Sequence, residues 1–75
     1  MTLDRITHDP SIMGGKACIR GMRITVTTVL KLLASGAARE QILADYPYLE
    51  NKDITQALQY AVFLTEDQSL MKIGP

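Results

Sequence analysis

The 75-residue chain predicts a single, mainly α domain with three helices and a short β element near its N-terminus. Apolar side chains recur at helical spacing in three segments, and glycine or proline separates these segments. In addition, 47% of the residues are hydrophobic, which suits a packed domain and not a disordered one. We divide the chain into a basic β and loop segment at 1–25, a three-helix core at 26–64 and a tail at 65–75.

The first segment is expected to be extended and interrupted by turns. A short strand is expected at Arg5–His8, and the glycines that follow it, Gly14 and Gly15, mark a tight loop. A second extended piece is expected at Lys16–Arg20. From Met22 to Val26, apolar and polar side chains alternate, which predicts a half-buried stretch that leads into the first helix.

The first helix is predicted at Val26–Ser35, with Thr25 as its N-cap and Gly36 as a left-handed C-cap. Its core stripe has the spacing i, i+3, i+4, i+7 and consists of Val26, Val29, Leu30 and Leu33. Leu32 lies off this stripe and is a candidate for contact with a partner.

The second helix is predicted at Arg39–Asp45, because Pro47 biases the residue before it away from helical geometry. The third helix is predicted at Lys52–Leu64, with Glu50 or Asn51 as the cap and Asn51 favoured by residue type. Its expected core stripe is Ile54, Ala57, Leu58, Ala61 and Val62. A short helix after a glycine-containing turn has the outline of a helix-turn-helix.

The third helix is apolar nearly all round in its C-terminal half, because Tyr60, Phe63 and Leu64 add a second apolar patch. A helix that is apolar on every side is buried on every side. Three short helices cannot provide that burial, so we expect a homodimer or a docked partner chain. The apolar residues of the tail, Leu70, Met71 and Ile73, are expected to join this interface.

Charge and composition narrow the functional classes. Residues 1–39 carry six cations and two anions, and residues 40–75 carry two cations and six anions, so the net charge is zero but unevenly distributed. This balance falls short of the basic excess of a dedicated nucleic-acid binder. With one cysteine (Cys18) and one histidine (His8), neither an intrachain disulfide nor a metal site is expected.

No catalytic constellation, cofactor loop, export signal or membrane-spanning run is recognisable in the sequence. We therefore expect a protein that is not an enzyme, has no cofactor and makes no membrane contact. The lone cysteine, without an export signal, favours the cytoplasm.

The pattern of residues resembles a known family over about Ile6 to Ala61. The shared positions are Ile6, Pro10, Gly14-Gly15-Lys16-x-Cys18-Ile19-Arg20-Gly21-x-Arg23-Ile24-x-Val26, Leu32-Leu33-Ala34-x-Gly36, Ile42-Leu43-x-Asp45-Tyr46-Pro47-x-Leu49 and Asp53-Ile54-x-x-Ala57-Leu58-x-Tyr60-Ala61. This combination resembles the small prokaryotic domain-of-unknown-function family numbered four hundred and thirty-three. The sequence departs from the usual pattern at Ala17, Met22, Thr25 and Ala38, and Ala38 weakens the cap of the second helix.

The resemblance implies a three-helix, homeodomain-like helix-turn-helix with a short β element at its N-terminus. Some members of that family look like antitoxins that pair with a PIN-domain ribonuclease toxin. The function that the resemblance implies is therefore an antitoxin-like interaction protein that dimerises. A dimeric helix-turn-helix regulator that binds DNA is the second interpretation, and a structural homo-oligomer with neither activity is the third.

The strongest candidates for a binding site are the cations Lys16, Arg20 and Arg23. Guanidinium groups on one edge of an extended stretch can bind DNA phosphates or the acidic groups of a partner. The alternative is that these cations are solvated or pair with the acidic second half of the same chain.

A DNA-reading third helix is a further possibility that the sequence leaves open. Its candidate contacts are Asn51, Lys52, Thr55, Gln56 and Gln59. However, Glu50 and Asp53 place negative charge at the end that would enter the groove, so sequence-specific binding through this helix is not expected. A weaker mode of DNA binding, through the N-terminal basic segment of a dimer, is favoured instead. Burial of the apolar segment from Tyr60 to Ile73 in a partner, with Glu66 and Asp67 on its cationic surface, is the preferred interaction mechanism.

Overall fold

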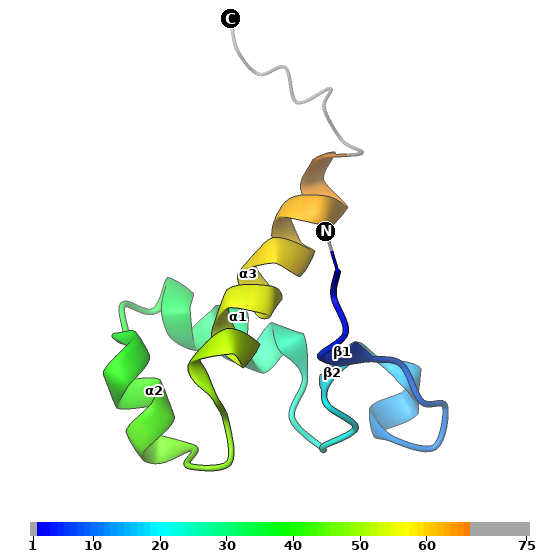
Figure 1. The fold of residues 1–75 in the computed structure, drawn as a ribbon, viewed down its shortest axis with the longest axis horizontal. Coiled ribbons are helices and arrows are strands. Elements are labelled where there is room, and N and C mark those ends of the chain that lie inside the picture. The colour runs from blue at the N-terminus through cyan, green and yellow to red at the C-terminus, as the bar shows by residue number, and fades with distance from the viewer. Residues whose placement is uncertain (1, 67–75) are drawn as a thin grey trace, which may run out of the picture.

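The computed structural model describes residues 2–66, which form two short strands, one turn of 3-10 helix and three α-helices (Figure 1). In chain order these are β1 at Ile6–Thr7, η1 at Met13–Gly15, β2 at Cys18–Ile19, α1 at Val26–Ala34, α2 at Arg39–Asp45 and α3 at Asn51–Glu66. The predicted fold class, a mainly helical bundle with an N-terminal β element, is confirmed.

The β element is a two-stranded antiparallel ladder in which Ile6 lies opposite Ile19 and Thr7 lies opposite Cys18. The predicted strand at Arg5–His8 and the predicted extended piece at 16–20 are both shorter in the structure, and they pair with each other. The ladder therefore fixes the N-terminal segment beside the stretch that enters α1.

A tight turn follows β2 and reverses the chain. Arg20 and Gly21 both have positive φ, at 46° and 70°, and the Met22 N–H donates a 2.8 Å hydrogen bond to the Ile19 carbonyl. The returning chain forms a bridge between Thr25 and Cys18. Because a residue with a Cβ rarely adopts this left-handed conformation, Arg20 needs other contacts to hold it there.

Both ends of α1 are closed by local hydrogen bonds, as predicted. The Thr25 hydroxyl accepts from the Thr28 N–H at 3.1 Å, which is an N-cap. At the other end Gly36 has φ 97°, its N–H donates to the Leu33 carbonyl, and the Ala37 N–H donates to the Leu32 carbonyl. This pair of bonds is a Schellman motif, which ends the helix one residue before the predicted Ser35.

The predicted bounds of α2 are confirmed, and its N-cap position, Ala38, makes no side-chain hydrogen bond to the helix. α3 begins at Asn51 and ends at Glu66, so it is longer than predicted at both ends. Asn51 is therefore the first helical residue and not the cap. Glu50 precedes the helix, and its N–H donates to the Asp53 carboxylate at 2.8 Å, as in half of a capping box.

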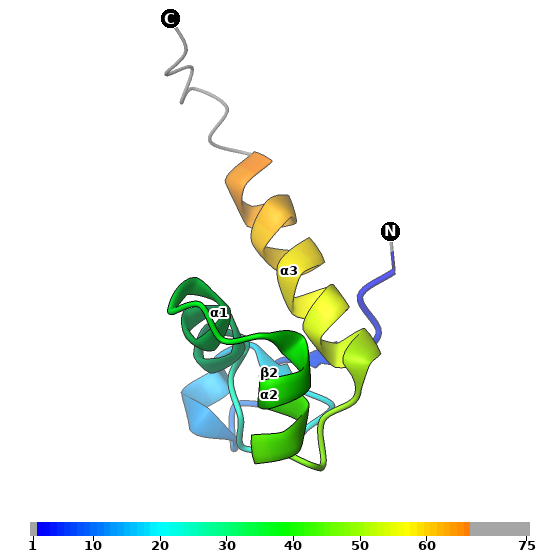
Figure 2. The same ribbon diagram turned by 90° about the vertical axis from the view of Figure 1, so that its left-hand side faces the viewer.

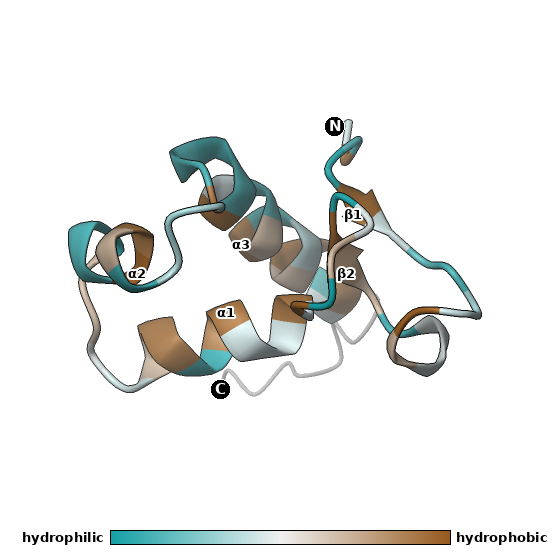
Figure 3. Ribbon diagram, turned by 90° about the horizontal axis from the view of Figure 1, so that it is seen from below, coloured by the Kyte–Doolittle hydropathy of each residue, from teal (hydrophilic) through white to brown (hydrophobic). Residues whose placement is uncertain are grey.

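The core lies where the three helices meet β2 and the stretch after it. Figure 3 shows hydrophobic stretches on α1, α2 and α3. The buried apolar side chains are Ile19, Ile24, Val26, Val29, Ile42, Leu49, Ile54 and Ala57. Leu32 is half-buried and packs against this core, since the chain doubles back at this end of α1. Its expected position off the core is wrong.

α3 extends well beyond the other elements, as the turned view shows (Figure 2). Its first half packs against α1, α2 and β1, where Ile54 and Ala57 are fully buried. Leu58 and Val62 were predicted to belong to the core stripe, and this is wrong, because they are 38% and 51% exposed. The bundle is too short to cover the second half of the helix.

Candidate functional site

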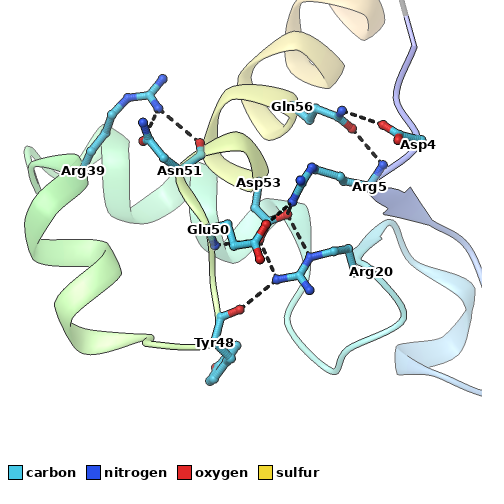
Figure 4. A network of polar contacts seen from close by, with 9 residues as sticks. All are labelled: Asp4, Arg5, Arg20, Arg39, Tyr48, Glu50, Asn51, Asp53 and Gln56. Atoms are coloured by element: carbon cyan, nitrogen blue, oxygen red, sulfur yellow. Dashed lines mark hydrogen bonds and ion pairs between the residues drawn. The ribbon is translucent and has the colours of Figure 1, made fainter.

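A buried carboxylate joins the N-terminal β element to α3. Asp53 lies in the first turn of α3, and its side chain is fully buried. Arg20 donates to it twice, from Nε to Oδ1 at 3.1 Å and from Nη2 to Oδ2 at 2.9 Å. Arg5 Nη1 donates to Oδ1 at 2.9 Å. Both carboxylate oxygens are therefore occupied by guanidinium groups that come from distant parts of the sequence (Figure 4).

Two outer contacts complete this network, which we call the Asp53 network and which comprises Arg5, Arg20, Glu50 and Asp53. Arg5 also pairs with Glu50 at 2.7 Å, and Arg20 Nη2 donates to the Tyr48 carbonyl at 2.8 Å (Figure 4). Two cations and two anions give the Asp53 network no net charge. It joins the residue before β1, the turn after β2, the α2–α3 connection and α3 to one another.

The hydrogen bonds keep the Asp53 network ionised. Burial alone raises the pKa of the Asp53 carboxyl, but hydrogen bonds from Arg20, the Glu50 N–H and Arg5 outweigh it, so the pKa lies below its ordinary value. The pKa of Arg20 is raised by its hydrogen bonds to Asp53. The pKa of Arg5 is raised by its bond to Glu50 and then by its bond to Asp53. A buried carboxylate paired in this way is suited to stabilise the fold.

The Asp53 network changes the interpretation of Arg20, which the sequence offered as a DNA or partner contact beside Arg23. Its guanidinium is bound within the chain, so the intramolecular alternative describes Arg20. Arg23 and Lys16 are exposed, and neither forms an ion pair with another residue of the 2–66 range. The two arginines therefore do not act together on one edge.

Three of the five candidate DNA contacts on α3 are already hydrogen-bonded within the chain. Arg39 Nη1 donates to Asn51 Oδ1 at 2.7 Å and to Thr55 Oγ1 at 3.1 Å. Gln56 accepts from the Arg5 N–H at 2.9 Å and donates to Asp4 Oδ1 at 2.8 Å (Figure 4). The neighbouring elements thus cover much of the polar surface at the start of α3.

The other two candidates on α3, Lys52 and Gln59, make no side-chain hydrogen bond within the described part of the chain. Lys52 is exposed and Gln59 is half-buried. Lys52 is therefore the one cation that α3 itself offers to a polyanion in residues 51–66.

The exposed apolar end of α3 is a second candidate surface, which we call the α3 tip. It consists of Leu58, Val62, Phe63 and Leu64, which are 38%, 51%, 50% and 48% exposed. Tyr60 is half-buried beside this surface, with its hydroxyl 3.3 Å from His8 Nε2. The other predicted interface residues, Leu70, Met71 and Ile73, lie outside the described residues, as does Asp67.

The part of the chain that the structure describes offers little for metal chemistry. Cys18 is a buried free thiol, as expected from the sequence, and no three His, Cys, Asp or Glu side chains within residues 2–66 are grouped to hold a metal ion. None of the helices in that range has the length and apolar character to cross a membrane.

Arg5 was not among the predicted site residues, and Asp53 was expected to be a charge facing a groove. The signal that could have found the Asp53 network was the opposite charge of the two halves of the chain. Arg20 follows a β-strand and precedes a glycine in a tight turn, and from this turn its side chain reaches Asp53. No local pattern identifies which of the acidic residues it meets.

The fold and the Asp53 network define a small helical bundle whose N-terminal β element is fastened to its third helix. The chain belongs to the family described as "Protein of unknown function (DUF433)", whose model matches residues 6–61. The resemblance stated from the sequence is therefore confirmed.

Two known proteins are similar to this chain, and the first of them is described as a member of the same family. The crystal structure of a DUF433 member protein from Anabaena variabilis has a TM-score of 0.76 and 31% identity, over 93% of this chain and 69% of that chain. "Uncharacterized protein y4eO" from Sinorhizobium fredii is 36% identical over 56 residues, which are 75% of this chain and 25% of that protein. This chain thus matches about a quarter of the length of that curated relative.

Proposed function

We propose that this chain is an antitoxin-like interaction protein without enzymatic activity, which docks onto a second protein chain through the α3 tip. The observation that carries this proposal is the exposure of four large apolar side chains on the last turns of one helix. Several large apolar side chains exposed at the end of one helix are typical of protein interaction sites.

The geometry favours protein docking over polar recognition at this helix. Ile54 and Ala57 pack into the bundle, and the helix then continues past the bundle (Figure 2). There the exposed Leu58 and Val62 lie one turn apart on one side of the helix. A helix that presents apolar side chains at this spacing suits a hydrophobic groove on a partner. Glu66, in its last turn, adds a negative charge for a cationic rim.

The partner we propose is a PIN-domain ribonuclease, with a homodimer of this chain as the binding unit. The resemblance to antitoxins motivates the nuclease, and the small size of the domain motivates the dimer. A domain of 75 residues buries proportionately little of its surface, so a second chain adds stability that one chain cannot provide.

Co-purification with a PIN-domain nuclease encoded beside the gene tests this proposal. We expect the wild-type chain to retain the nuclease and to inhibit its RNA cleavage. Phe63→Glu places a charge in the α3 tip and should abolish both effects. Ala44→Glu is the matched control, because Ala44 is exposed on α2 and the charge change is the same.

The outcome that contradicts the proposal is equal retention of the nuclease by the wild-type chain and Phe63→Glu. Sedimentation velocity at micromolar concentration tests the dimer separately. A wild-type chain that sediments as a monomer, with no change in Phe63→Glu, would contradict the dimer. Binding of the nuclease would then be judged from the co-purification result only.

DNA binding is the second candidate function, which the exposed cations Lys16, Arg23 and Lys52 favour. Binding to its own upstream DNA should weaken steeply with salt, because each phosphate contact releases counterions. Lys52→Gln should reduce this binding and Lys31→Gln, on exposed α1 surface, should not. If neither nuclease nor DNA binds and the chain still associates with itself, the structural homo-oligomer is the remaining function.

A further inference from the structure

A hollow opens between the turn after β2 and the connection from α2 to α3. Its volume is about 310 Å³, and it is lined by Met22, Arg23, Ile24 and Tyr48. This volume lies at the lower end of the range for ligand pockets, which begins at about 300 Å³. The hollow therefore suits one side chain of a longer ligand.

The two walls of the hollow are fastened to each other. Arg20 belongs to the turn that forms one wall, and its Nη2 donates to the carbonyl of Tyr48 in the other wall at 2.8 Å. Arg20 is itself held by the buried Asp53 carboxylate. The Tyr48 ring contacts the Tyr46 ring edge to face, with centroids 6.1 Å apart. These contacts hold the backbone of the two walls at a fixed spacing.

The chemistry of the lining combines an apolar floor with one cation. Ile24 is buried and Met22 is half-buried, and both offer apolar surface, whereas Tyr48 is 51% exposed. The Asp53 network is neutral, so its charges do not compensate Arg23, which has no ion-pair partner within residues 2–66. An apolar group that lies next to a carboxylate matches this lining.

We propose that the hollow binds an acidic peptide segment of a partner protein, in which an aromatic residue lies next to an aspartate or glutamate. The aromatic ring packs against Met22 and Tyr48, and the carboxylate pairs with the Arg23 guanidinium. Methionine and tyrosine side chains both contact aromatic rings favourably. This site is separate from the α3 tip and does not depend on the function proposed for it.

The test is a titration of the full ¹⁵N-labelled chain with the capped peptide acetyl-Gly-Phe-Asp-Gly-amide, followed by amide chemical shifts. We expect saturable shifts at Met22, Ile24 and Tyr48. Replacing Asp by Asn in the peptide should weaken binding about fivefold, which is the upper range for an exposed ion pair. Replacing Phe by Ala should weaken it about tenfold, through the loss of apolar contact.

Variants of the protein test whether Arg23 is the cation that pairs with the carboxylate of the peptide. Arg23→Gln should bind the Asp and Asn peptides equally, whereas Lys16→Gln, which removes another exposed cation, should keep the fivefold difference. Phe63→Glu should bind the peptide as the wild type does, because the α3 tip is a different surface. Shifts centred elsewhere, equal binding of the two peptides by the wild-type chain, or no saturable shift would each overturn the proposal.

Discussion

The Arg20 guanidinium and the Asp53 carboxylate, 33 residues apart in the sequence, meet through two hydrogen bonds, of 3.1 Å and 2.9 Å. Arg20 lies in a left-handed turn position, and Asp53 lies in the first helical turn of α3. The pair thereby joins the β element to the helix whose far end we propose as a docking surface. This contact, together with the burial of Ile54 and Ala57, positions α3 relative to the rest of the domain.

The first prediction concerns the loss of the buried charge. Asp53→Asn removes the carboxylate that Arg5 and Arg20 share. Because these two side chains are 21% and 34% exposed and Arg5 keeps its pairing with Glu50, we expect a cost of about 1.5–3 kcal/mol, as for hydrogen bonds to charged groups. We expect a much lower urea midpoint, measured by circular dichroism. Asp45→Asn is the control, because Asp45 is exposed. Equal midpoints for the two variants would show that the Asp53 network does not support the fold.

The second prediction separates charge from geometry. Arg20→Lys keeps the positive charge but loses the two-pronged contact with Asp53 and the bond to the Tyr48 carbonyl. The urea midpoint should fall clearly below that of the wild-type chain. Arg23→Lys should leave the midpoint unchanged, since Arg23 is exposed and has no ion-pair partner within residues 2–66. If both variants unfold alike, the planar fork of Arg20 has no special role.

The third prediction is a loss of stability in acid. The pKa of Asp53 is lower in the folded chain than its ordinary value of 3.8, so the unfolded chain binds more protons in this range. The stability from the ionised carboxylate is then fully present above about pH 4 and is lost as the pH falls through the lowered pKa. Urea midpoints measured from pH 7 to pH 2 should show this decline.

A flatter acid profile in Asp53→Asn checks the assignment of that pH dependence. Some slope should remain in this variant, because the pKa of Asp4 is also lowered by its bond to Gln56, and that of Asp9 by its bonds to Ser11. A variant profile parallel to that of the wild-type chain below pH 4 would assign the acid sensitivity to groups other than Asp53.

Local patterns predicted the helices well, because the signals that start and stop a helix lie within a few residues of its ends. The Thr25 cap, Gly36 and Pro47 fixed three helix ends to within one residue. The Asp53 network could not be derived in the same way. Its partners come from three separate segments, and a carboxylate in a first helical turn is equally suited to the helix dipole or to solvent.

The length of α3 that the other helices cover could not be predicted from a local pattern either. Helical periodicity assigned Leu58 and Val62 to the core, but periodicity reports a side of the helix and not how far the other helices extend along it. α1 and α2 are short and cover only the first half of α3. The same residues therefore became candidates for an interface.

The fourth prediction is a gain in stability when the missing N-cap of α2 is supplied. Ala38 occupies the N-cap position of α2 with extended φ and ψ and makes no side-chain bond to the helix. Ala38→Ser supplies a hydroxyl that can accept from an N–H of the first turn, which should add about 1 kcal/mol to the free energy of unfolding. Ala44→Ser, inside the helix, should instead lower it by about 0.5 kcal/mol. A rise in both variants would exclude capping as the cause.

The last prediction separates the folding role of α3 from its proposed binding role. Ile54→Ala removes a fully buried side chain and should cost about 2–5 kcal/mol of unfolding free energy. Phe63→Ala truncates a side chain that is 50% exposed, and such changes usually stay within about 0.5 kcal/mol.

If the α3 tip binds a partner, Phe63→Ala should weaken that binding while the urea midpoint of the monomeric chain, measured at a concentration below that of self-association, stays unchanged. A large loss of stability in Phe63→Ala, measured on a monomeric chain, would mean that the tip is covered by the chain itself. The docking surface would then be absent, because the apolar side chains that define it would already be buried.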